Sequence, residues 1–251
     1  MPAIGAVSMI IIEAMTTEVV ARDAIVRLLS YDTCTLSNAI ERLSVRPRNE
    51  GFMHGRVRCQ FPNLPPVLGH AVTARLRSSM PPIHGHCYYD NPDWWEYVAS
   101  MPAPRIVVMQ DCDHQRGLGA LFGEAHARIC QALEGVAYVT DGSVRDVGGI
   151  EPTGFQLFAG GVSVSHAYAH VVEFGVPVDV GGLRVLPGDL LHGDRHGVLS
   201  IPKDVLDLLP AAADEVLWED RQMFECCSDK EFSIDKLKRK LVELREKQRC
   251  E

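Results

Sequence analysis

Glu124, Arg145 and Asp146 combine residue types that suit the binding of an acid beside a metal ion. Glu124 follows a glycine at the start of a helical pattern, so the first free amides of that helix, those of Ala125 and His126, can receive a carboxylate. Arg145 offers a planar fork that suits a carboxylate, and Asp146 offers a hard oxygen ligand for a cation. These residues therefore predict a site for a small acid and a metal ion.

The spacing of these residues along the chain would bring them together. Twenty residues separate Glu124 from Arg145, enough for a helix and a returning strand, so the turn at 141–146 comes back to the same edge of a sheet. Gly142 lets that turn bend tightly. A few oxygen ligands with room for water suit Mg²⁺, or Mn²⁺, better than zinc, which prefers nitrogen and sulfur. For any one of these residues alone, a helix start or a turn cap is the simpler interpretation.

Apolar periodicity predicts the elements that must position this site. Between 106 and 140 the order is strand, glycine-rich turn, helix and strand, which is typical of a right-handed βαβ unit with its binding side at the strand ends. The N-cap of the helix predicted at 32–43 is expected at Thr35 or Ser37. Helical spacing occurs at 16–29, 32–43, 94–101, 121–133, 204–225 and 233–246. Short apolar runs predict strands at 68–76, 106–109, 137–140, 155–158, 162–164, 176–180 and 198–201.

The length of 251 residues is enough for one substantial core, and no change in composition marks a boundary before about residue 228. We therefore expect a single domain over 1–228. The charged amphipathic helix that begins near Ser233 is expected to form a tail over 229–251, which could pack on a partner subunit.

Charge and cysteine usage exclude several classes of protein. A net charge of -8 and a pI near 5.7 argue against a basic surface for nucleic acid. The apolar stretch at 6–12 is short and ends at Glu13, so we expect neither a signal peptide nor a membrane span. We therefore expect a cytoplasmic location. The eight cysteines show no CxxC pairs, and the adjacent Cys226 and Cys227 lack further zinc ligands, so reduced thiols are expected.

Several polar residues outside this set could also do chemistry. The loop that follows the predicted strand at 106–109 could supply a ligand or a general base, although a solvated loop is the simpler interpretation; it contains Asp111, Cys112, Asp113 and His114. His166 and His170 lie four residues apart without the glutamate of an HExxH motif, so they are interpreted as pocket or core histidines.

A second polar cluster lies in the segment GDLLHGDRHG and includes Asp189, His192, Asp194, Arg195 and His196. Glycine and aspartate often serve the backbone in turns, so this segment is expected to form a turn. Asp194 and Arg195 are the members most suited to reach the site of a neighbouring subunit. Trp94 and Trp95 are interpreted as packing residues.

Four stretches together resemble a known family: DTCTLSNAIERL, GHAVTARLRS, the GE-x20-RD core and VLPGDLLHGDRHGVLSIP. Over about Leu29 to Glu219 the chain resembles the RraA-like proteins, which include the class II 4-hydroxy-4-methyl-2-oxoglutarate / 4-carboxy-4-hydroxy-2-oxoadipate aldolases. The resemblance implies an α/β fold, an αββα sandwich of the swivelling phosphohistidine-domain type, here with a C-terminal helical extension. It also implies a homotrimer or homohexamer with active sites between subunits.

The resemblance further implies a role for each site residue. Asp146 would be the direct metal ligand, Glu124 the acid that holds metal-bound water, and Arg145 the substrate contact, while the Ala125 and His126 amides would hold the carboxylate of the oxo acid. The aldolase pattern continues RD-x2-[Glu/Asp], but this chain has glycine at position 149. Glu151, two residues further on, could take the place of that acid if the turn is rearranged.

The function expected from these residues is that of a divalent-metal-dependent aldolase, which cleaves a 4-hydroxy-2-oxo acid to pyruvate. The same enolate chemistry would permit decarboxylation of oxaloacetate. A non-catalytic regulatory protein that resembles the ribonuclease E inhibitor is the alternative from another class. A lyase or hydratase for another hydroxy acid is the third, since the segment at 83–97 is rich in histidine and tyrosine.

Overall fold

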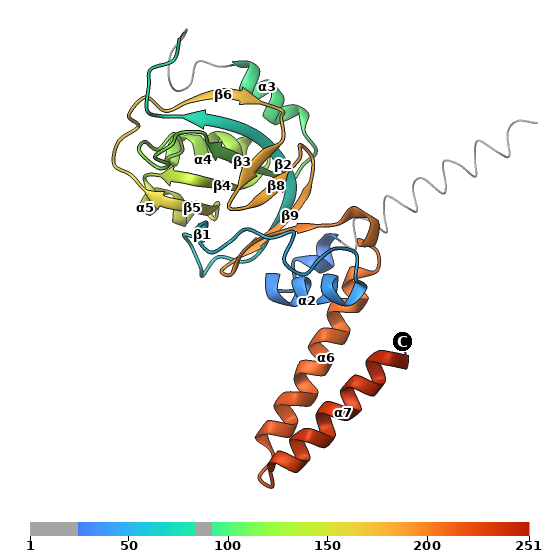
Figure 1. Ribbon diagram of the computed structural model, residues 1–251. Coiled ribbons are helices and arrows are strands. Elements are labelled where there is room, and N and C mark those ends of the chain that lie inside the picture. The colour runs from blue at the N-terminus through green and yellow to red at the C-terminus, as the bar shows by residue number, and fades with distance from the viewer. Residues whose placement is uncertain (1–24, 84–91, 251) are drawn as a thin grey trace, which may run out of the picture.

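The computed structural model describes residues 25–83 and 92–250, and its centre is an eight-stranded mixed sheet that curves strongly around the core (Figure 1). The path through the sheet is β1-β5-β4-β3-β2-β9-β10, and β6 pairs with β2 beside that path. The strands are β1 (Arg58–Cys59), β2 (Val67–Arg77), β3 (Arg105–Asp111), β4 (Gly135–Val144), β5 (Gln156–Val162), β6 (His170–Phe174), β9 (Leu190–Asp194) and β10 (Gly197–Ile201). A separate small hairpin pairs β7 (Val178–Val180) with β8 (Leu183–Val185).

Helices lie on the sheet and extend beyond it. They are α2 (Thr33–Leu43), α3 (Pro92–Ser100), α4 (Glu124–Ala132), the single turn α5 (Val147–Ile150), α6 (Leu209–Ser228) and α7 (Ile234–Cys250), with short 3-10 turns at Glu151–Thr153 and Lys203–Val205. The expected α/β class with a helical C-terminal region is confirmed. Among the described residues, no helix is both long enough and apolar enough to cross a membrane.

Four neighbouring strands, β2, β3, β4 and β5, run parallel to one another. Their carboxyl ends therefore meet at one edge of the sheet, and α4 connects β3 to β4 as the predicted βαβ unit requires. These strands read as nearly continuous apolar runs because they are buried on both faces. Along β3, Val107 and Met109 face the core beneath α4, whereas Ile106 and Val108 face the core on the opposite side of the sheet.

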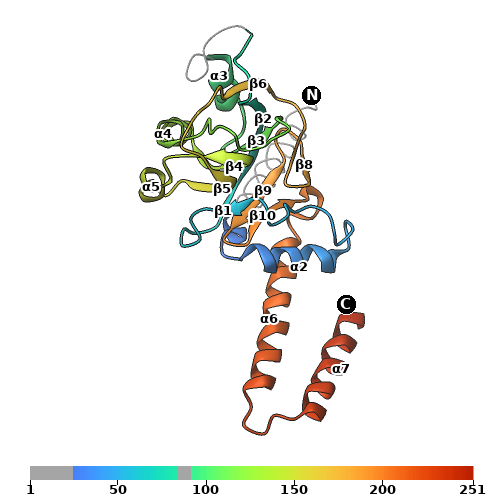
Figure 2. The same cartoon turned by 60° about the vertical axis from the view of Figure 1, so that its left-hand side comes forward.

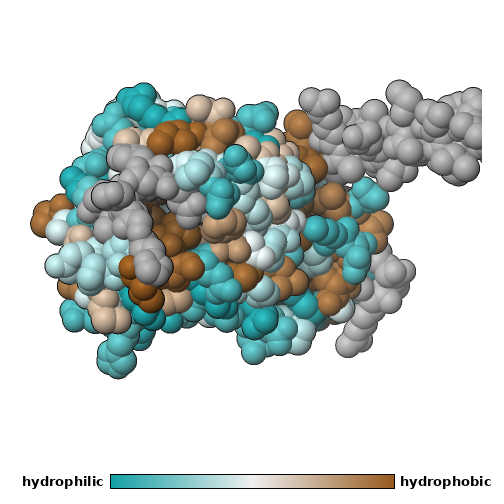
Figure 3. All heavy atoms as spheres, turned by 90° about the horizontal axis from the view of Figure 1, so that it is seen from above, coloured by the Kyte–Doolittle hydropathy of each residue, from teal (hydrophilic) through white to brown (hydrophobic). Residues whose placement is uncertain are grey.

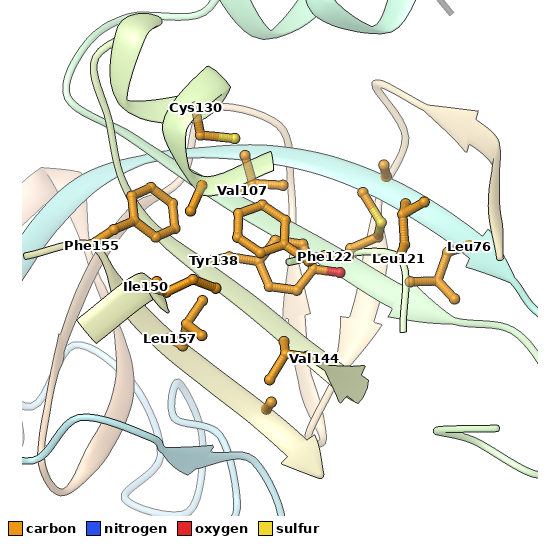
Figure 4. Close-up of a cluster of buried hydrophobic side chains, with 14 of the residues drawn as sticks. Leu76, Val107, Leu121, Phe122, Cys130, Tyr138, Val144, Ile150, Phe155 and Leu157 are labelled. Carbon is orange, nitrogen blue, oxygen red and sulfur yellow. The ribbon is translucent and has the colours of Figure 1, made fainter. Parts of the chain in front are cut away.

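Aromatic rings fill the core beneath α4 (Figure 4). The Phe122 ring stacks on the Tyr138 ring with centroids 4.0 Å apart, and the Phe155 ring lies 5.6 Å from Phe122. Trp94 of α3 is 4% exposed and packs at the edge of the same core, in agreement with the packing role expected for the tryptophan pair. Phe122 directly precedes the turn that leads into α4, so this core fixes where α4 begins.

The helix α2 packs on α6 and on the strands β9 and β10 through a third apolar cluster. Its N-cap is Asp32, whose carboxylate accepts a hydrogen bond from the Thr35 amide at 2.7 Å. The predicted N-cap at Thr35 or Ser37 is therefore wrong, because an acid just ahead of the helix already satisfies its free amides.

The last two helices form an antiparallel hairpin that projects away from the sheet (Figures 1 and 2). Leu244 of α7 is buried at 7% exposure, and the Lys247 ammonium lies 3.7 Å from the centre of the Trp218 ring of α6. Helices were expected at 204–225 and 233–246, and both are found with shifted bounds. Packing of the tail on a partner subunit stays a prediction.

Some predicted elements differ from those found. The segment expected as a turn contains the strand β9, because Leu190 and Leu191 pair with β2 and are buried. The predicted strand at 162–164 is wrong beyond Val162, since Val164 lies outside β5 and is 94% exposed. The strands β6 and β8 were not predicted. Of the predicted helix at 16–29, residues 16–24 lie outside the described residues, as do residues 84–91 of the polar segment at 83–97.

Candidate functional site

The predicted site residues meet at the carboxyl edge of the parallel strands. Arg145 and Asp146 follow directly on β4, and Glu124 is the first residue of α4. The Arg145 amide donates to the Phe122 carbonyl at 3.0 Å, and a parallel bridge joins Phe122 to Val144. The end of β4 and the start of α4 are therefore tied together, as their spacing predicted.

Each of the two site carboxylates lies against a glycine of the opposite segment. A Cβ atom on Gly123 would stand 2.5 Å from Oδ2 of Asp146, and a Cβ atom on Gly149 would stand 2.2 Å from Oε2 of Glu124. Asp146 itself has a positive φ of 53°, a conformation that costs energy for a residue other than glycine and is often kept at functional sites. Two glycines and a strained aspartate thus let both carboxylates approach the start of α4.

The Arg145 guanidinium is held by two neighbours. Its Nε donates to Oδ1 of Asp146 at 3.3 Å, and its Nη1 lies 2.8 Å from Nδ1 of His166. The arginine side chain is 27% exposed, so an anion can still reach it. His166 therefore contacts the predicted site, whereas the Nδ1 of His170 lies 2.7 Å from the Tyr168 carbonyl. The interpretation of both as pocket or core histidines stays a prediction.

The first turn of α4 contains a charged residue, Glu124, and a buried residue, His126. Glu124 accepts hydrogen bonds at Oε1 from Nε and Nη2 of Arg128, at 3.0 and 2.8 Å, one helical turn further on. The His126 ring is buried between the rings of Trp95 and Phe122. Burial and then the nearby His166 lower the pKa of His126 to about 4, so its side chain is neutral at pH 7 and packs in the core.

A buried pair of acids, Asp111 and Asp141, lies near this edge; Asp111 was a candidate from the sequence, but its pairing with Asp141 was not predicted. Asp141 accepts a hydrogen bond from the Asp111 amide at 2.9 Å and forms an ion pair with Arg116 at 2.6 Å. Burial raises the pKa of both carboxyl groups. Asp111 in turn accepts from the Gly117 amide at 2.7 Å, so this pair shapes the loop between β3 and α4.

The remaining residues of that loop have structural roles or face solvent. Burial alone would raise the pKa of Asp113, but hydrogen bonds from Ser79 and Ser78 outweigh it and lower that pKa. Burial raises the pKa of the half-buried Cys112 thiol, and His114 is exposed. The solvated-loop interpretation therefore holds for His114. The Asp113 carboxylate instead accepts hydrogen bonds from the two serines that follow β2.

The second polar cluster lies at the opposite edge of the sheet. Val67, the first residue of β2, pairs with Gly193, so Asp194 stands at the amino end of the parallel strands. Its buried carboxylate accepts from the amides of Thr33 and His196 at 2.9 and 2.8 Å. Within one chain this aspartate fastens α2 to the sheet and does not join Asp146. A reach into a neighbouring subunit stays a prediction.

The two carboxylates at the start of α4 are the candidate ligands for a metal ion. Among residues 25–83 and 92–250, no three His, Cys, Asp or Glu side chains are grouped as metal ligands. A role of Glu151 in place of the acid absent at 149 stays a prediction. Mg²⁺ is commonly held by one or two carboxylates together with water and substrate, and Asp146 and Glu124 provide such a pair. The donor set thus fits Mg²⁺ or Mn²⁺ and does not fit a closed zinc site.

The chain is similar to a described family and to known proteins. A family model described as RraA-like, Aldolase/RraA, matches residues 33–200. A protein of Halalkalibacterium halodurans named "Putative 4-hydroxy-4-methyl-2-oxoglutarate aldolase" is 27% identical over 147 residues, which cover 58% of this chain and 68% of that protein. Protein DlpA of Legionella pneumophila is 34% identical over 119 residues, which cover 44% of this chain but only 18% of DlpA.

Two solved structures share the fold at low sequence identity. An uncharacterized protein from Pseudomonas syringae superposes with a TM-score of 0.66 and 20% identity, over 84% of this chain and 90% of that one. RraAS2 of Streptomyces coelicolor, described as an unusual member of the RNase ES inhibitor RraA protein family, gives a TM-score of 0.62 and 21% identity, over 79% and 94% of the two chains. The fold expected from the sequence resemblance is therefore confirmed.

Proposed function

The chain belongs to the RraA-like family, and from that premise we propose that it is a divalent-metal-dependent lyase that cleaves a 4-hydroxy-2-oxo acid to release pyruvate. One observation carries the proposal. The end of β4 brings Arg145 and Asp146 to the start of α4, where Glu124 adds a second carboxylate over Gly149. This arrangement supports the proposal, because a guanidinium suits a substrate carboxylate and carboxylate oxygens suit a divalent metal ion.

Each group at this edge has a distinct task in the proposed reaction. Arg145 and the first amides of α4, those of Ala125 and His126, would bind and orient the carboxylate of the oxo acid. Asp146 and Glu124 would hold Mg²⁺ or Mn²⁺, which when bound supplies Lewis-acid stabilisation of negative charge on the 2-oxo group.

The chemistry of the cleavage fixes what the site must accommodate. The C4 hydroxyl loses its proton and becomes a carbonyl, the C3–C4 bond breaks, and its electron pair stays on the three-carbon fragment. A proton taken up at C3 then gives pyruvate. Oxaloacetate loses carbon dioxide to give the same fragment, so its decarboxylation is proposed as a second activity of the site.

We also propose that the site is used in a homotrimer or homohexamer in the cytoplasm. Apolar side chains are exposed near the site, around the end of β5 and along β6: Val162, Val164, Tyr168 and Val172. Figure 3, which views the molecule from above, shows apolar residues gathered in places among hydrophilic ones. Such patches often mark interfaces.

Light scattering after size exclusion should give the mass of a trimer or a hexamer for the wild type, and Val164→Asp should lower that mass. A wild-type protein with the mass of a monomer would contradict the proposed assembly.

The direct test is a screen for pyruvate release. 4-Hydroxy-2-oxo acids and oxaloacetate are offered to the protein with Mg²⁺, with Mn²⁺ and with a chelator. Arg145→Ala and Asp146→Ala should each lower kcat/KM by at least about a hundredfold, because each removes a charged contact to substrate or metal. Arg184→Ala is the matched control, since Arg184 is 68% exposed on β8. Full metal-dependent activity of the Arg145 and Asp146 variants would refute the assignment.

A binding function like that of the ribonuclease E inhibitor is the second candidate. The absent acid at 149 favours it, because a regulatory protein has no need of a complete metal shell. Arg145 and Asp146 favour the lyase, since a surface binder has no evident need of a strained aspartate beside a held guanidinium. Silence on every substrate, together with capture of a ribonuclease from lysate, would decide for the binding function.

A further inference from the structure

We propose that His166 is a positioning residue that sets the direction in which Arg145 presents its guanidinium to the carboxylate of a 2-oxo acid. The inference rests on the proposed function, which assigns that carboxylate to Arg145. Nη1 of Arg145 lies 2.8 Å from Nδ1 of His166, the shorter of its two contacts with the ring, since Nε2 is 3.4 Å away.

The turn that presents His166 is fixed by backbone hydrogen bonds on both sides. The Ala120 amide donates to the Ser165 carbonyl at 2.9 Å, and the Tyr168 amide donates to the Ser78 carbonyl at 3.1 Å. These bonds attach the turn to the loop before α4 and to the end of β2. The histidine is therefore held by the elements that form the site, and its position does not depend on a free loop.

The same turn contains local strain and a close approach. Ala167 has a positive φ of 47°, and its amide donates to the Ser165 hydroxyl at 2.9 Å. A Cβ atom on Gly119 would stand 2.3 Å from the His166 carbonyl, so only glycine lets the loop before α4 lie this close. A positive φ in a residue other than glycine persists where the surroundings enforce it, often at functional sites.

The donor and acceptor types fix the state of the histidine. A guanidinium can only donate, so Nδ1 of His166 must accept, and a ring that accepts at Nδ1 is neutral and carries its proton on Nε2. Burial and the positive charge of Arg145 lower the pKa of His166, while Asp146 acts in the opposite direction. At pH 7 the ring is therefore in the form that can accept from Arg145.

This arrangement leaves the rest of the guanidinium for substrate. The contact with Asp146 uses Nε and the contact with His166 uses Nη1, so the two together fix the plane of the fork. Nη2 carries two further N–H groups that can meet a carboxylate. Among residues 25–83 and 92–250, the charged and titratable groups that act on the imidazole include Arg145, Asp146 and His126. When acid protonates His166, it loses its acceptor and repels Arg145, so carboxylate binding weakens.

The first test measures the contact without any substrate. Nitrogen NMR of the histidine rings should place the proton of His166 on Nε2, and Arg145→Gln should raise the pKa of His166, because a neighbouring positive charge is removed. His170→Ala, four residues along the same segment, is the control and should leave the His166 titration unchanged. A His166 titration that does not respond to Arg145→Gln would overturn the inference, whatever the enzyme assay shows.

The second test measures pyruvate binding by calorimetry in the presence of Mg²⁺. His166→Ala should weaken binding about tenfold at pH 7.5, whereas His166→Gln should recover most of it, because its amide oxygen can accept from Arg145. The glutamine variant should also lose the fall in affinity that the wild type shows as pH drops through the His166 pKa. Equal affinity of His166→Ala and wild type would overturn the inference. If the His166 titration responds to Arg145→Gln but the protein has no lyase activity, the proposed function is refuted and the contact between His166 and Arg145 is not.

Discussion

At the residue scale, the Glu124 carboxylate lies against Gly149. Position 149, where the sequence resemblance implies an acid, lies directly beside the Glu124 carboxylate, since a Cβ atom there would stand 2.2 Å from its Oε2. Glu124 occupies that space and is also held by Arg128. The chain therefore presents two carboxylates at this edge, and a metal ion held there, as proposed, would take its remaining ligands from water and substrate.

Restoring an acid at this position should strengthen metal binding. Gly149→Asp adds a third carboxylate beside Glu124 and Asp146, and the flexible end of Glu124 can move aside to admit it. The affinity for Mn²⁺, measured by electron paramagnetic resonance, should rise about tenfold. Gly148→Asp is the matched control, because no atom lies within 4 Å of a Cβ at that position. Equal affinities of the two variants would show that position 149 does not face the metal.

Gly123 should be as important to the site as the charged residues. A methyl group from Gly123→Ala would stand 2.5 Å from the Asp146 carboxylate and 3.0 Å from Cγ of Arg145, so both side chains must move. We expect kcat/KM for pyruvate release to fall at least about tenfold, with a much smaller effect on the free energy of unfolding. Steady-state kinetics and urea unfolding measure the two quantities. An active Gly123→Ala protein would mean that Asp146 does not work from its present position.

The sequence predicted part of this residue-scale arrangement. Glu124, Arg145 and Asp146 could be brought together because a helix and a strand connect them. The contact between Arg145 and His166 could not be predicted, because it depends on how the turn after β5 folds back over Gly119. The ion pair between Asp141 and Arg116 was missed for the same reason, since loops carry no periodic signal.

At the scale of elements, one buried carboxylate attaches the start of α2 to the sheet. Asp194 at the end of β9 accepts from the Thr33 amide at the start of α2, and its side chain is 6% exposed. Burial alone would raise the pKa of Asp194, but the hydrogen bonds outweigh it and the pKa is lowered. This group therefore adds stability above its unfolded pKa of about 3.9, and that stability is lost as pH falls through the lower folded pKa.

Asp194→Asn should destabilise the fold in a pH-dependent way. Urea unfolding at pH 7 should show a loss of about 1–3 kcal/mol, because two amide hydrogen bonds lose their charged acceptor. The difference from wild type should shrink as pH falls below about 4 toward the folded pKa. Asp207→Asn, at an exposed position, is the control and should change stability little. A difference that stays constant down to acid pH would contradict this role.

Elements were predictable where their periodicity is strong. The strands β2, β3 and β4 and the helices α2 and α4 were located because buried runs and amphipathic spacing mark them. The strand β9 was missed because its glycine and charged residues resemble a turn, and only pairing with β2 shows that they are buried. Tertiary contact therefore overrode local propensity in this segment.

At the scale of the whole molecule, the α6–α7 hairpin stands apart from the sheet (Figures 1 and 2). The family match ends at residue 200, before either helix begins. Most of α7 is exposed, yet Leu244 is buried at 7% exposure and Cys226 of α6 is buried to the same extent. The expected division into a domain at 1–228 and a tail at 229–251 stays a prediction that this packing makes testable.

A charge at Leu244 should detach α7 and leave the sheet intact. Leu244→Asp removes a buried apolar contact and places a carboxylate in it, so alkylation of the Cys226 thiol should become much faster. Near-UV circular dichroism from the aromatic core should stay the same. Val242→Asp is the control, because Val242 is 53% exposed on the same helix. If Leu244→Asp instead loses the near-UV signal of the aromatic core, α7 is an integral part of the domain.

The most direct test of the central claim is the rate of pyruvate release from 4-hydroxy-4-methyl-2-oxoglutarate by wild type and Asp146→Asn, each measured with Mg²⁺ and with a chelator. Asp146→Asn keeps the size of the side chain and removes its charge. We predict metal-dependent release by the wild type and a loss of at least about a hundredfold in the variant. Release that is equally fast without metal, or undiminished in Asp146→Asn, would contradict the account.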